Sequence, residues 1–165
     1  MDGLTVTPAR DDDKATFSNL IQLYLYDMTE SMPFPVGSDG RFNYDFFDRF
    51  WQFPYLIRSD LEIAGFAFVI DRCPLTDRRP CFFMAEFFVL KACRRRGIGK
   101  AFMNELIDRH QGDWHVAAPV QNHSALAFWQ KALGGFGPEV EELVFDGDLW
   151  RLHQFTSPSD AGPAR

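Results

Sequence analysis

The sequence has few cysteines, no long apolar run and no signal-peptide pattern. Its three cysteines, Cys73, Cys81 and Cys93, are an odd number and form no C-x-x-C pair. This argues against a disulfide framework or a zinc site and favours a reducing compartment. No apolar stretch is long enough to span a bilayer, and the N-terminus is acidic and polar. We therefore expect a cytoplasmic protein that does not enter the membrane.

Basic charge is also in short supply. The 17 Lys and Arg are outnumbered by 23 Asp and Glu, so the formal charge is −6. This balance argues against nucleic acid as a partner and is compatible with a cationic or amine substrate. The length of 165 residues fits one domain, which we expect to cover residues 1–156. We expect the polar stretch 157–165 to be a disordered tail.

The hydrophobic pattern alternates between strand and helix periods along the chain. We expect strands at 4–7, 54–59, 61–70, 82–90, 114–118, 141–145 and 149–156. We expect helices at 44–51, 98–111 and 122–133, and a first helix that is capped within 11–13 and extends to about residue 30. This order predicts an α/β fold with a mixed sheet. Gly65 lies inside one of the strands, which indicates a bulge or a close backbone approach.

The stretch 85–100 joins an apolar strand, a basic loop with two glycines and the start of an amphipathic helix. A helix N-terminus has unpaired N–H groups and a partial positive charge, so it attracts anions. Gly97 and Gly99 let the backbone approach a ligand closely. Three arginines and Lys100 add full positive charge. The stretch therefore predicts a phosphate site, although a plain strand-to-helix turn with solvated arginines would show the same residues.

Two motifs narrow the kind of phosphate. The nucleoside triphosphate pattern fails because Ala101 follows Lys100, and the dinucleotide pattern lacks its third glycine. The pattern R-x-x-G-x-G fits as Arg94-Arg95-Arg96-Gly97-Ile98-Gly99. A second motif, N-x-x-A-x-x-F-W-x-K, follows from Asn122 to Lys131. With these two motifs the chain resembles the GNAT superfamily of N-acetyltransferases, of a bacterial type.

This resemblance implies a fold and a cofactor. The fold would be the acyl-CoA N-acyltransferase fold, with a mixed, mostly antiparallel sheet flanked by helices, and acetyl-CoA would be the co-substrate. Its pantetheine would pair with the backbone of Phe87, Phe88 and Val89 where the central strand splays from the next one. Its pyrophosphate would bind at Arg94, Arg95, Arg96, Gly97, Ile98, Gly99 and Lys100, with Asn122, Phe128 and Trp129 flanking the cofactor. Asn122 is also a plausible helix N-cap, and both roles can hold together.

Glu86 is the candidate general base. It is the only acidic residue in the run 82–90, and a carboxylate on an apolar strand is costly unless it is paired or functional. Several enzymes of the family place an acidic base at about this point. The alternative is a Glu86 that is salt-bridged to a nearby arginine.

Trp129 departs from the family pattern. The family places a Tyr there as general acid, whereas an indole N–H donates a hydrogen bond but not a proton. Either the thiolate leaves unaided or water protonates it, or another group substitutes, or the protein binds CoA without efficient catalysis. The candidate substitutes are Tyr24, Tyr26, His123 and Cys93. We favour an unaided thiolate, since thiols have a pKa of roughly 8.5. Core packing is the simplest role for Trp129.

The acceptor side has a weaker signal. The resemblance places the first helices over the acceptor, where Tyr24, Asp27 and Tyr44 suit a cationic amine through charge pairing and cation–π contact. A solvated helix face explains the same residues. His115 and His153 have no cluster of ligand-type neighbours in the sequence, so no metal is expected.

These observations together predict an N-acetyltransferase. It would move an acetyl group from acetyl-CoA to a primary amine of a small molecule or peptide. The alternative is a CoA-binding regulatory or interaction module with little turnover. Acylation of a charged tRNA would require a basic substrate surface, which the acidic N-terminal half does not offer. A homodimer is compatible with the sequence.

Overall fold

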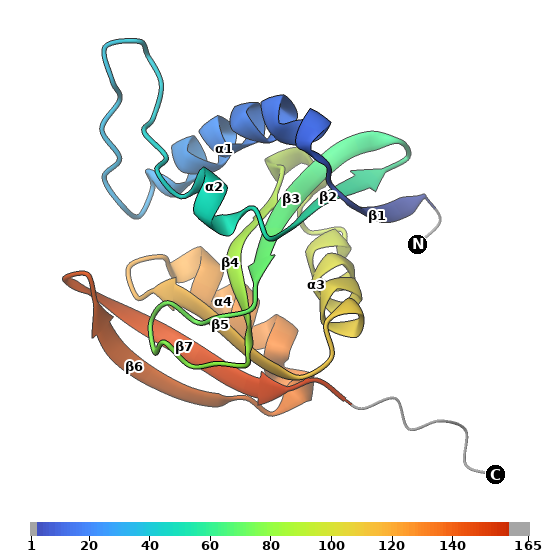
Figure 1. Cartoon of the computed structure of the whole chain (residues 1–165), viewed down its shortest axis with the longest axis vertical. Helices are drawn as coiled ribbons and strands as arrows, with labels where there is room; N and C mark the ends of the chain where they lie inside the picture. The colour runs from blue at the N-terminus through green and yellow to red at the C-terminus, as the bar shows by residue number, and fades with distance from the viewer. Residues whose placement is uncertain (1–2, 159–165) are drawn as a thin grey trace. The chain divides into compact units, whose positions relative to one another are not determined.

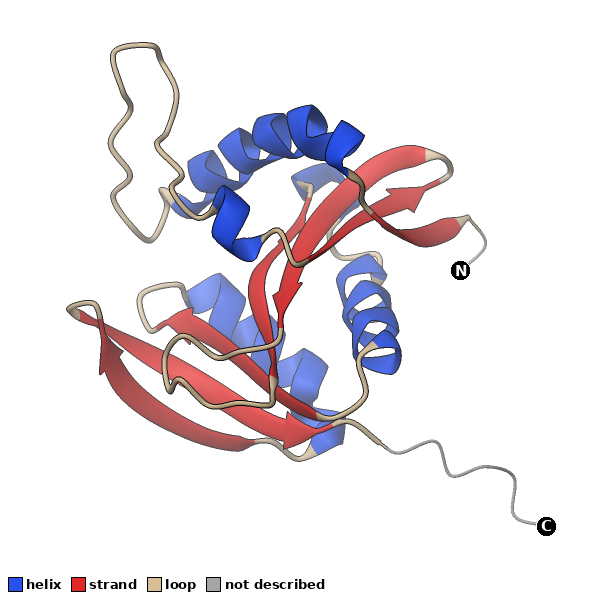
Figure 2. Ribbon diagram, viewed as in Figure 1, coloured by secondary structure: helices blue, strands red, loops and turns tan. Residues whose placement is uncertain are grey.

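The computed structural model describes residues 3–158, and its helices and strands follow the expected order (Figures 1 and 2). The strands are β1 (Leu4–Pro8), β2 (Phe53–Ser59), β3 (Glu62–Ile70), β4 (Phe82–Val89), β5 (Asp113–Pro119), β6 (Glu139–Phe145) and β7 (Asp148–Thr156). The α-helices are α1 (Lys14–Met28), α2 (Phe47–Phe50), α3 (Ile98–Arg109) and α4 (His123–Leu133). Short 3-10 turns cover Asp11–Asp13, Lys91–Cys93 and Gly134–Phe136. The expected α/β class is thereby confirmed.

One predicted helix is shorter than expected. The sequence predicts a helix over 44–51, whereas α2 covers only Phe47–Phe50. Tyr44 instead belongs to the loop between α1 and α2, where its hydroxyl donates a hydrogen bond to Glu86. This tertiary contact overrides the local helical pattern, as often happens in short segments.

The chain forms two compact units. One comprises Met1–Ile70 and Ala85–Gly99, and the other comprises Asp71–Met84 and Lys100–Arg165. The strand order is β1-β2-β3-β4-β5-β7-β6, so β4 begins in the second unit and ends in the first. A single domain over 1–156 stays a prediction.

The first unit is built on an antiparallel ladder of β1, β2 and β3. Helix α1 buries its apolar stripe, Phe17, Leu20, Ile21 and Leu25. The Phe17 ring lies against Phe66 and Phe68 of β3, with centroids 5.5 Å and 5.4 Å away. Most of β3 is buried, as its nearly continuous apolar sequence requires. This aromatic core holds α1 over the end of β4 that carries Glu86.

Gly65 lies where the backbones of β3 and β4 come close together. The β2–β3 register shifts between the pairs Ile57–Gly65 and Arg58–Ile63, which marks a bulge in β3 beside Gly65. A Cβ atom at Gly65 would collide with the carbonyl oxygen of Phe88. Leu90 N–H donates to Ala64 carbonyl oxygen at 2.8 Å. The expected bulge and close approach at Gly65 are both confirmed.

The second unit contains antiparallel β5, β7 and β6, and the start of β4 pairs in parallel with β5 at Phe82–Trp114 and Phe83–His115. The β6–β7 turn has positive φ at Asp146 (51°) and Gly147 (84°), as a two-residue hairpin of the primed type requires. Helix α4 buries Leu126, Trp129, Ala132 and Leu133.

Ser157 lies next to the end of the described part of the chain, which is residue 158. It was expected in the tail, but it is buried and its N–H donates to Gly112 carbonyl oxygen at 2.9 Å. The rest of the expected tail, residues 159–165, lies outside the described residues. Within 3–158, the helices are too short or too polar to cross a membrane.

Candidate active site

Glu86 of β4 lies between two tyrosine hydroxyls. Tyr24, on the inner side of α1, donates to Oε2 of Glu86 through a short hydrogen bond. Tyr44, from the loop between α1 and α2, donates to Oε1 at 3.0 Å. The Tyr24 ring is held between aromatic neighbours, with centroids 5.7 Å from Phe66 and 5.5 Å from Phe88. Each carboxylate oxygen of Glu86 therefore has a donor from a different segment of the chain.

The environment of Glu86 makes its proton hard to lose. Burial raises the pKa of Glu86 from 4.5 to about 7, and the hydrogen bonds from Tyr24 and Tyr44 offset only part of this effect. Burial also raises the pKa of Tyr24 and of Tyr44, and the charge of Glu86 raises both further. The tyrosines therefore stay protonated as hydrogen-bond donors. Glu86 changes its protonation state close to neutral pH, which suits a general acid or base.

The partners of Glu86 decide between the two interpretations of this residue. Its hydrogen-bond partners are two neutral hydroxyls rather than the arginine of an ion pair. A carboxylate in a structural ion pair has a lowered pKa, whereas that of Glu86 is raised. The arrangement therefore favours the functional interpretation.

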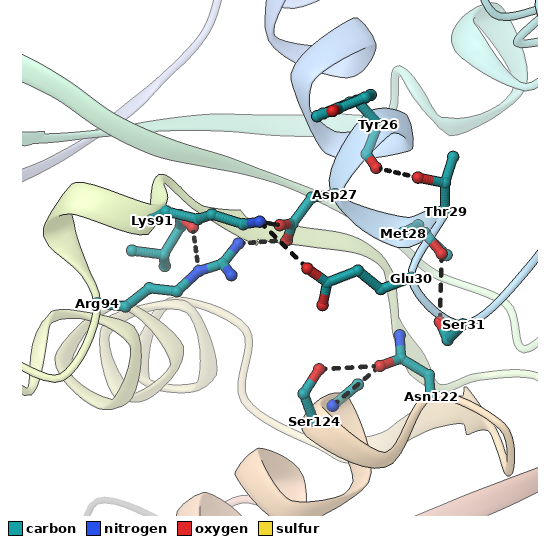
Figure 3. A network of polar contacts seen from close by, with 12 residues as sticks. Tyr26, Asp27, Met28, Thr29, Glu30, Ser31, Lys91, Arg94, Asn122 and Ser124 are labelled. Atoms are coloured by element: carbon teal, nitrogen blue, oxygen red, sulfur yellow. Dashed lines mark hydrogen bonds and ion pairs between the residues drawn. The ribbon is translucent and has the colours of Figure 1, made fainter.

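A second carboxylate, Asp27, lies on α1 about one turn after Tyr24. It binds two cations of the loop after β4. Lys91 Nζ is 3.0 Å from Asp27 Oδ1, and the Arg94 guanidinium binds Oδ2 (Figure 3). Lys91 also lies 3.4 Å from Glu30 Oε1. Burial alone would raise the pKa of Asp27, but the hydrogen bonds and charges of Arg94 and Lys91 together lower it. This Asp27 cluster joins α1 to the predicted phosphate loop.

Arg94 is also tied to the end of β4. Its Nε donates to the Val89 carbonyl oxygen at 2.8 Å, and its guanidinium carbon lies 5.7 Å from the centroid of the Phe88 ring. Of the residues predicted to pair with pantetheine, Phe88 and Val89 are buried and Phe87 is half-buried. The guanidinium of Arg94 thus already donates hydrogen bonds to other groups of the protein. The neighbouring Arg95 and Arg96 are exposed.

Two residues of the loop after β4 have positive φ, a feature that anion-binding nests share. Arg95 has φ 63° and Gly97 has φ 77°, on either side of Arg96. Alternation of left- and right-handed residues turns successive N–H groups toward one side, which creates a concave site for phosphate oxygens. Helix α3 then begins at Ile98 and adds its unpaired N–H groups. These residues fit the diphosphate of a nucleotide.

The predicted site residues of the second unit have structural roles of their own. Asn122 caps α4, because its Oδ1 accepts from Ala125 N–H at 3.1 Å and from Ser124 Oγ at 3.2 Å (Figure 3). Trp129 is buried and lies edge-on to Phe128, with centroids 4.8 Å apart. Lys100 is exposed in the first turn of α3. Contacts of these four residues with a cofactor stay predictions.

Tyr24, Asp27 and Tyr44 were predicted from the sequence as acceptor contacts. The structure brings Tyr24 and Tyr44 to Glu86 and Asp27 to the loop cations. Their contact with an acceptor stays a prediction. The sequence reasoning missed Lys91, and its charge three residues before Arg94 was the one available signal. Over residues 3–158, no group of His, Cys, Asp and Glu side chains is placed to hold a metal ion.

Comparison with known proteins assigns the chain to a family. The model of the acetyltransferase (GNAT) family matches residues 22–135. No curated protein sequence matches the chain. The chain belongs to the GNAT acetyltransferase family, since the match covers more than half of its length.

Solved structures show the same fold at low sequence identity. A GNAT-family acetyltransferase from Streptococcus agalactiae has a TM-score of 0.72 at 17% identity, over 96% of this chain and 98% of that one. The ribosomal-protein-S5-alanine acetyltransferase from Vibrio fischeri has a TM-score of 0.66 at 14% identity, over 99% of this chain and 97% of that one. A putative acetyltransferase from Salmonella typhimurium, solved with its cofactor acetyl-CoA, gives 0.63 at 14%, over 99% of both chains. The predicted family and fold are confirmed.

Proposed function

We propose that the protein is an N-acetyltransferase that moves the acetyl group of acetyl-CoA to a primary amine of a small molecule or peptide. The observation that carries this proposal is the carboxyl of Glu86, held by Tyr24 and Tyr44 with a pKa of about 7. Membership of the GNAT family supplies the acetyl donor, and one structural neighbour was solved with acetyl-CoA.

In this proposal Glu86 is the general base. The neutral amine nitrogen forms a bond to the thioester carbon, and the resulting tetrahedral intermediate carries a proton on nitrogen that must leave. The Glu86 carboxylate accepts this proton directly or through one water. A base whose pKa lies near the working pH combines a useful ionised fraction with adequate basicity. The C–S bond then breaks and releases CoA.

The leaving thiolate needs no strong acid. Trp129 occupies the position of the usual Tyr and cannot supply a proton. Because the pKa values of Tyr24 and Tyr44 are raised, these phenols are also poor proton donors. A thiol has a pKa of roughly 8.5, so its thiolate departs without prior protonation near neutral pH. The CoA thiolate then takes a proton from water, and Glu86 gives the proton it accepted back to the solvent. The Glu86 carboxylate is thereby regenerated, and the products are the amide and the CoA thiol.

The loop 94–99 is the proposed holder of the diphosphate of acetyl-CoA. Its backbone and the exposed Arg95 and Arg96 supply N–H donors and positive charge. Arg94 acts differently, because Asp27 and the Val89 carbonyl already engage it. It orders the loop, and the backbone and the two exposed arginines bind the anion.

Two assays separate the proposed enzyme from a CoA-binding module without turnover. Thermal shift with acetyl-CoA should show stabilisation under both proposals, whereas CoA release across a panel of primary amines should occur only with the enzyme. Binding without release for any amine supports the module. Absence of binding contradicts both.

A glycine variant links binding to the loop. Gly97→Val should weaken acetyl-CoA binding at least about tenfold, because a side chain at φ 77° strains the loop backbone. Gly147→Val is the matched control, since Gly147 has φ 84° in the β6–β7 turn. Equal affinity of Gly97→Val and the unmodified protein would remove the loop from the site.

A further inference from the structure

The loop between α1 and α2 supplies Tyr44, one of the two donors to Glu86. Side-chain hydrogen bonds join this loop to α1. Its tip has an internal structure: Val36 and Phe42 form a β-bridge, and Gly37 N–H donates to Arg41 carbonyl oxygen at 2.8 Å. Gly40 N–H donates to Gly37 carbonyl oxygen at 2.9 Å. Because these bonds join residues of the segment 36–42 to one another, its backbone shape does not depend on contacts with α1.

Gln22 holds this segment to the helix. Its Nε2 donates to the Phe42 carbonyl oxygen at 3.0 Å, and its Oε1 accepts from the Phe42 N–H at 2.8 Å. One side-chain amide thus satisfies both backbone groups of one loop residue, as a neighbouring strand would do. Tyr44, the donor to Glu86, follows two residues later.

A hollow lies between α1 and the α1–α2 loop. The hollow has a volume of about 250 Å³, and its lining residues are Ser18, Ile21, Gln22, Arg41, Phe42, Tyr44 and Phe47. The other polar tie joins the exposed Arg41 guanidinium to Ser18 Oγ at 3.2 Å. Since continuous packing is interrupted here, the paired bonds of Gln22 are the stronger fastening.

We propose that Gln22 is a positioning residue for the base: by holding Phe42 it keeps Tyr44 over Glu86 and keeps water away from the carboxyl. The inference rests on the proposed function for its catalytic meaning, but the coupling from Gln22 to Glu86 is a property of the folded chain. The side-chain amide of Gln22 is hydrogen-bonded to the backbone of Phe42, so its proposed effect on Glu86 passes through the α1–α2 loop.

The proposal predicts pKa shifts of opposite sign for two variants. Tyr44→Phe keeps the ring as a cover and removes a hydrogen bond that lowers the pKa of Glu86, so the pKa should rise. Gln22→Met keeps the side-chain length but releases the loop and admits water. Burial is the largest cause of the raised pKa, so its relief should lower the pKa by about one unit even though the Tyr44 bond is lost.

The other groups around Glu86 stay constant in this comparison. The titratable groups facing its carboxyl are Tyr24 from α1 and Tyr44 from the loop. The charge of Asp27 raises the pKa of Tyr24. The ion pairs of Asp27 with Lys91 and Arg94 involve neither Gln22 nor the loop between α1 and α2. A change of the Glu86 titration in Gln22→Met therefore reports the release of the loop.

The test is a ¹³C NMR titration of the Glu86 carboxyl in protein labelled at glutamate Cδ, with the resonance assigned by its absence in Glu86→Gln. Gln22→Met should move the midpoint down and Tyr44→Phe should move it up. In the double variant, Tyr44→Phe should add no further upward shift, because the released loop no longer presents residue 44. Hydrogen exchange of the Phe42 amide should accelerate at least about tenfold in Gln22→Met, since its acceptor is gone.

Gln121→Met is the matched control, because Gln121 Nε2 donates to Asp148 Oδ1 at 3.1 Å on an exposed surface. It should leave the midpoint unchanged. An unchanged or raised midpoint in folded Gln22→Met overturns the proposal. The titration needs no turnover, so it stands apart from the transferase assay: a coupled carboxyl without CoA release contradicts the proposed function alone. Where turnover is present, the acid limb of kcat/KM should follow the NMR midpoint.

Discussion

Glu86 accepts a hydrogen bond from α1 and Asp27 belongs to α1, but the pKa values of these two carboxylates shift in opposite directions. Glu86 is half-buried and accepts from two tyrosine hydroxyls, and its pKa rises to about 7. Asp27, whose side chain is 19% exposed, binds Lys91 and Arg94, and its pKa falls. Burial raises the pKa at both sites. The charge of the partners decides the sign.

The comparison separates the proposed base from a carboxylate that binds cations of its own chain. Neutral hydroxyls direct the Glu86 oxygens without fully offsetting the cost of burying a charge. The positive charges of Lys91 and Arg94 offset that cost for Asp27. Its carboxylate therefore stays ionised and joins α1 to the loop after β4. Acidic residues on α1 are therefore a poor guide to an acceptor site, because one of them neutralises the basic loop of its own chain.

The largest expected difference between the two carboxylates is in turnover. Glu86→Gln should lower kcat roughly 100- to 1,000-fold, because the amide accepts no proton, and acetyl-CoA affinity should be kept. Asp27→Asn, the matched change, should keep kcat within roughly tenfold because Asp27 is outside the proton path. Steady-state kinetics and thermal shift measure both. Normal rates in Glu86→Gln would exclude this residue as the base.

The second difference is in stability against pH. Between about pH 4.5 and 7, Glu86 is ionised in the unfolded chain but keeps its proton in the folded protein. The folded state then binds more protons, so the free energy of unfolding falls as pH rises through this window, by about 3 kcal/mol in total. Glu86→Gln should remove this loss in urea titrations at pH 5 and 8. Asp27 has the opposite sign, since its stabilisation is lost as pH falls through its lowered pKa.

A third difference concerns the hydrogen bond of Tyr24. Tyr24→Phe should cost about 1–3 kcal/mol of unfolding free energy at pH 8, where the Glu86 carboxylate loses a buried donor. Tyr26→Phe on the same helix is the control, since Tyr26 is 69% exposed, and should stay within about 0.5 kcal/mol. Chemical denaturation measures both. Equal losses would mean that the short bond adds nothing to stability.

The smallest effect is expected for the ion pairs of Asp27. Asp27→Asn should cost about 1 kcal/mol or less, because Lys91 and Arg94 are 60% and 38% exposed. The loss should shrink in 1 M NaCl, at which the screening length falls to about 3 Å. Glu105→Gln, which breaks the Glu105–Arg109 pair on α3, should behave alike. A loss for Asp27→Asn that salt does not change would indicate a buried rather than a screened pair.

Local sequence patterns predict much of this fold because their causes are local. The apolar strand before Arg94, the Asn122 cap and the break between the strands predicted at 141–145 and 149–156 all follow from residues within a few positions. The helix predicted over 44–51 is wrong at its start, because the partner of Tyr44 is 42 residues away.

The candidate site is predicted only in part for the same reason. Glu86 stands out because it is an acid on an apolar strand, but its donors come from 62 and 42 residues away, and spacing carries no sign of them. Arg94 shows its charge in the sequence, yet its partner Asp27 is 67 residues distant. The two hydrogen bonds of Gln22 to Phe42 involve backbone groups that every residue except proline has, so side-chain identity at 42 could not reveal them.

Cys93 has a practical consequence for the assays. Cys73 and Cys81 are buried, whereas Cys93 is half-exposed in the turn just before Arg94. A colorimetric disulfide reagent that counts released coenzyme will therefore also modify this thiol, adding up to one equivalent per chain to the background. The same reactivity lets a single fluorophore be attached beside the loop with no other cysteine replaced. A Cys93→Ser protein is the appropriate blank for the first use, and quenching of that dye by added nucleotide is the natural readout for the second.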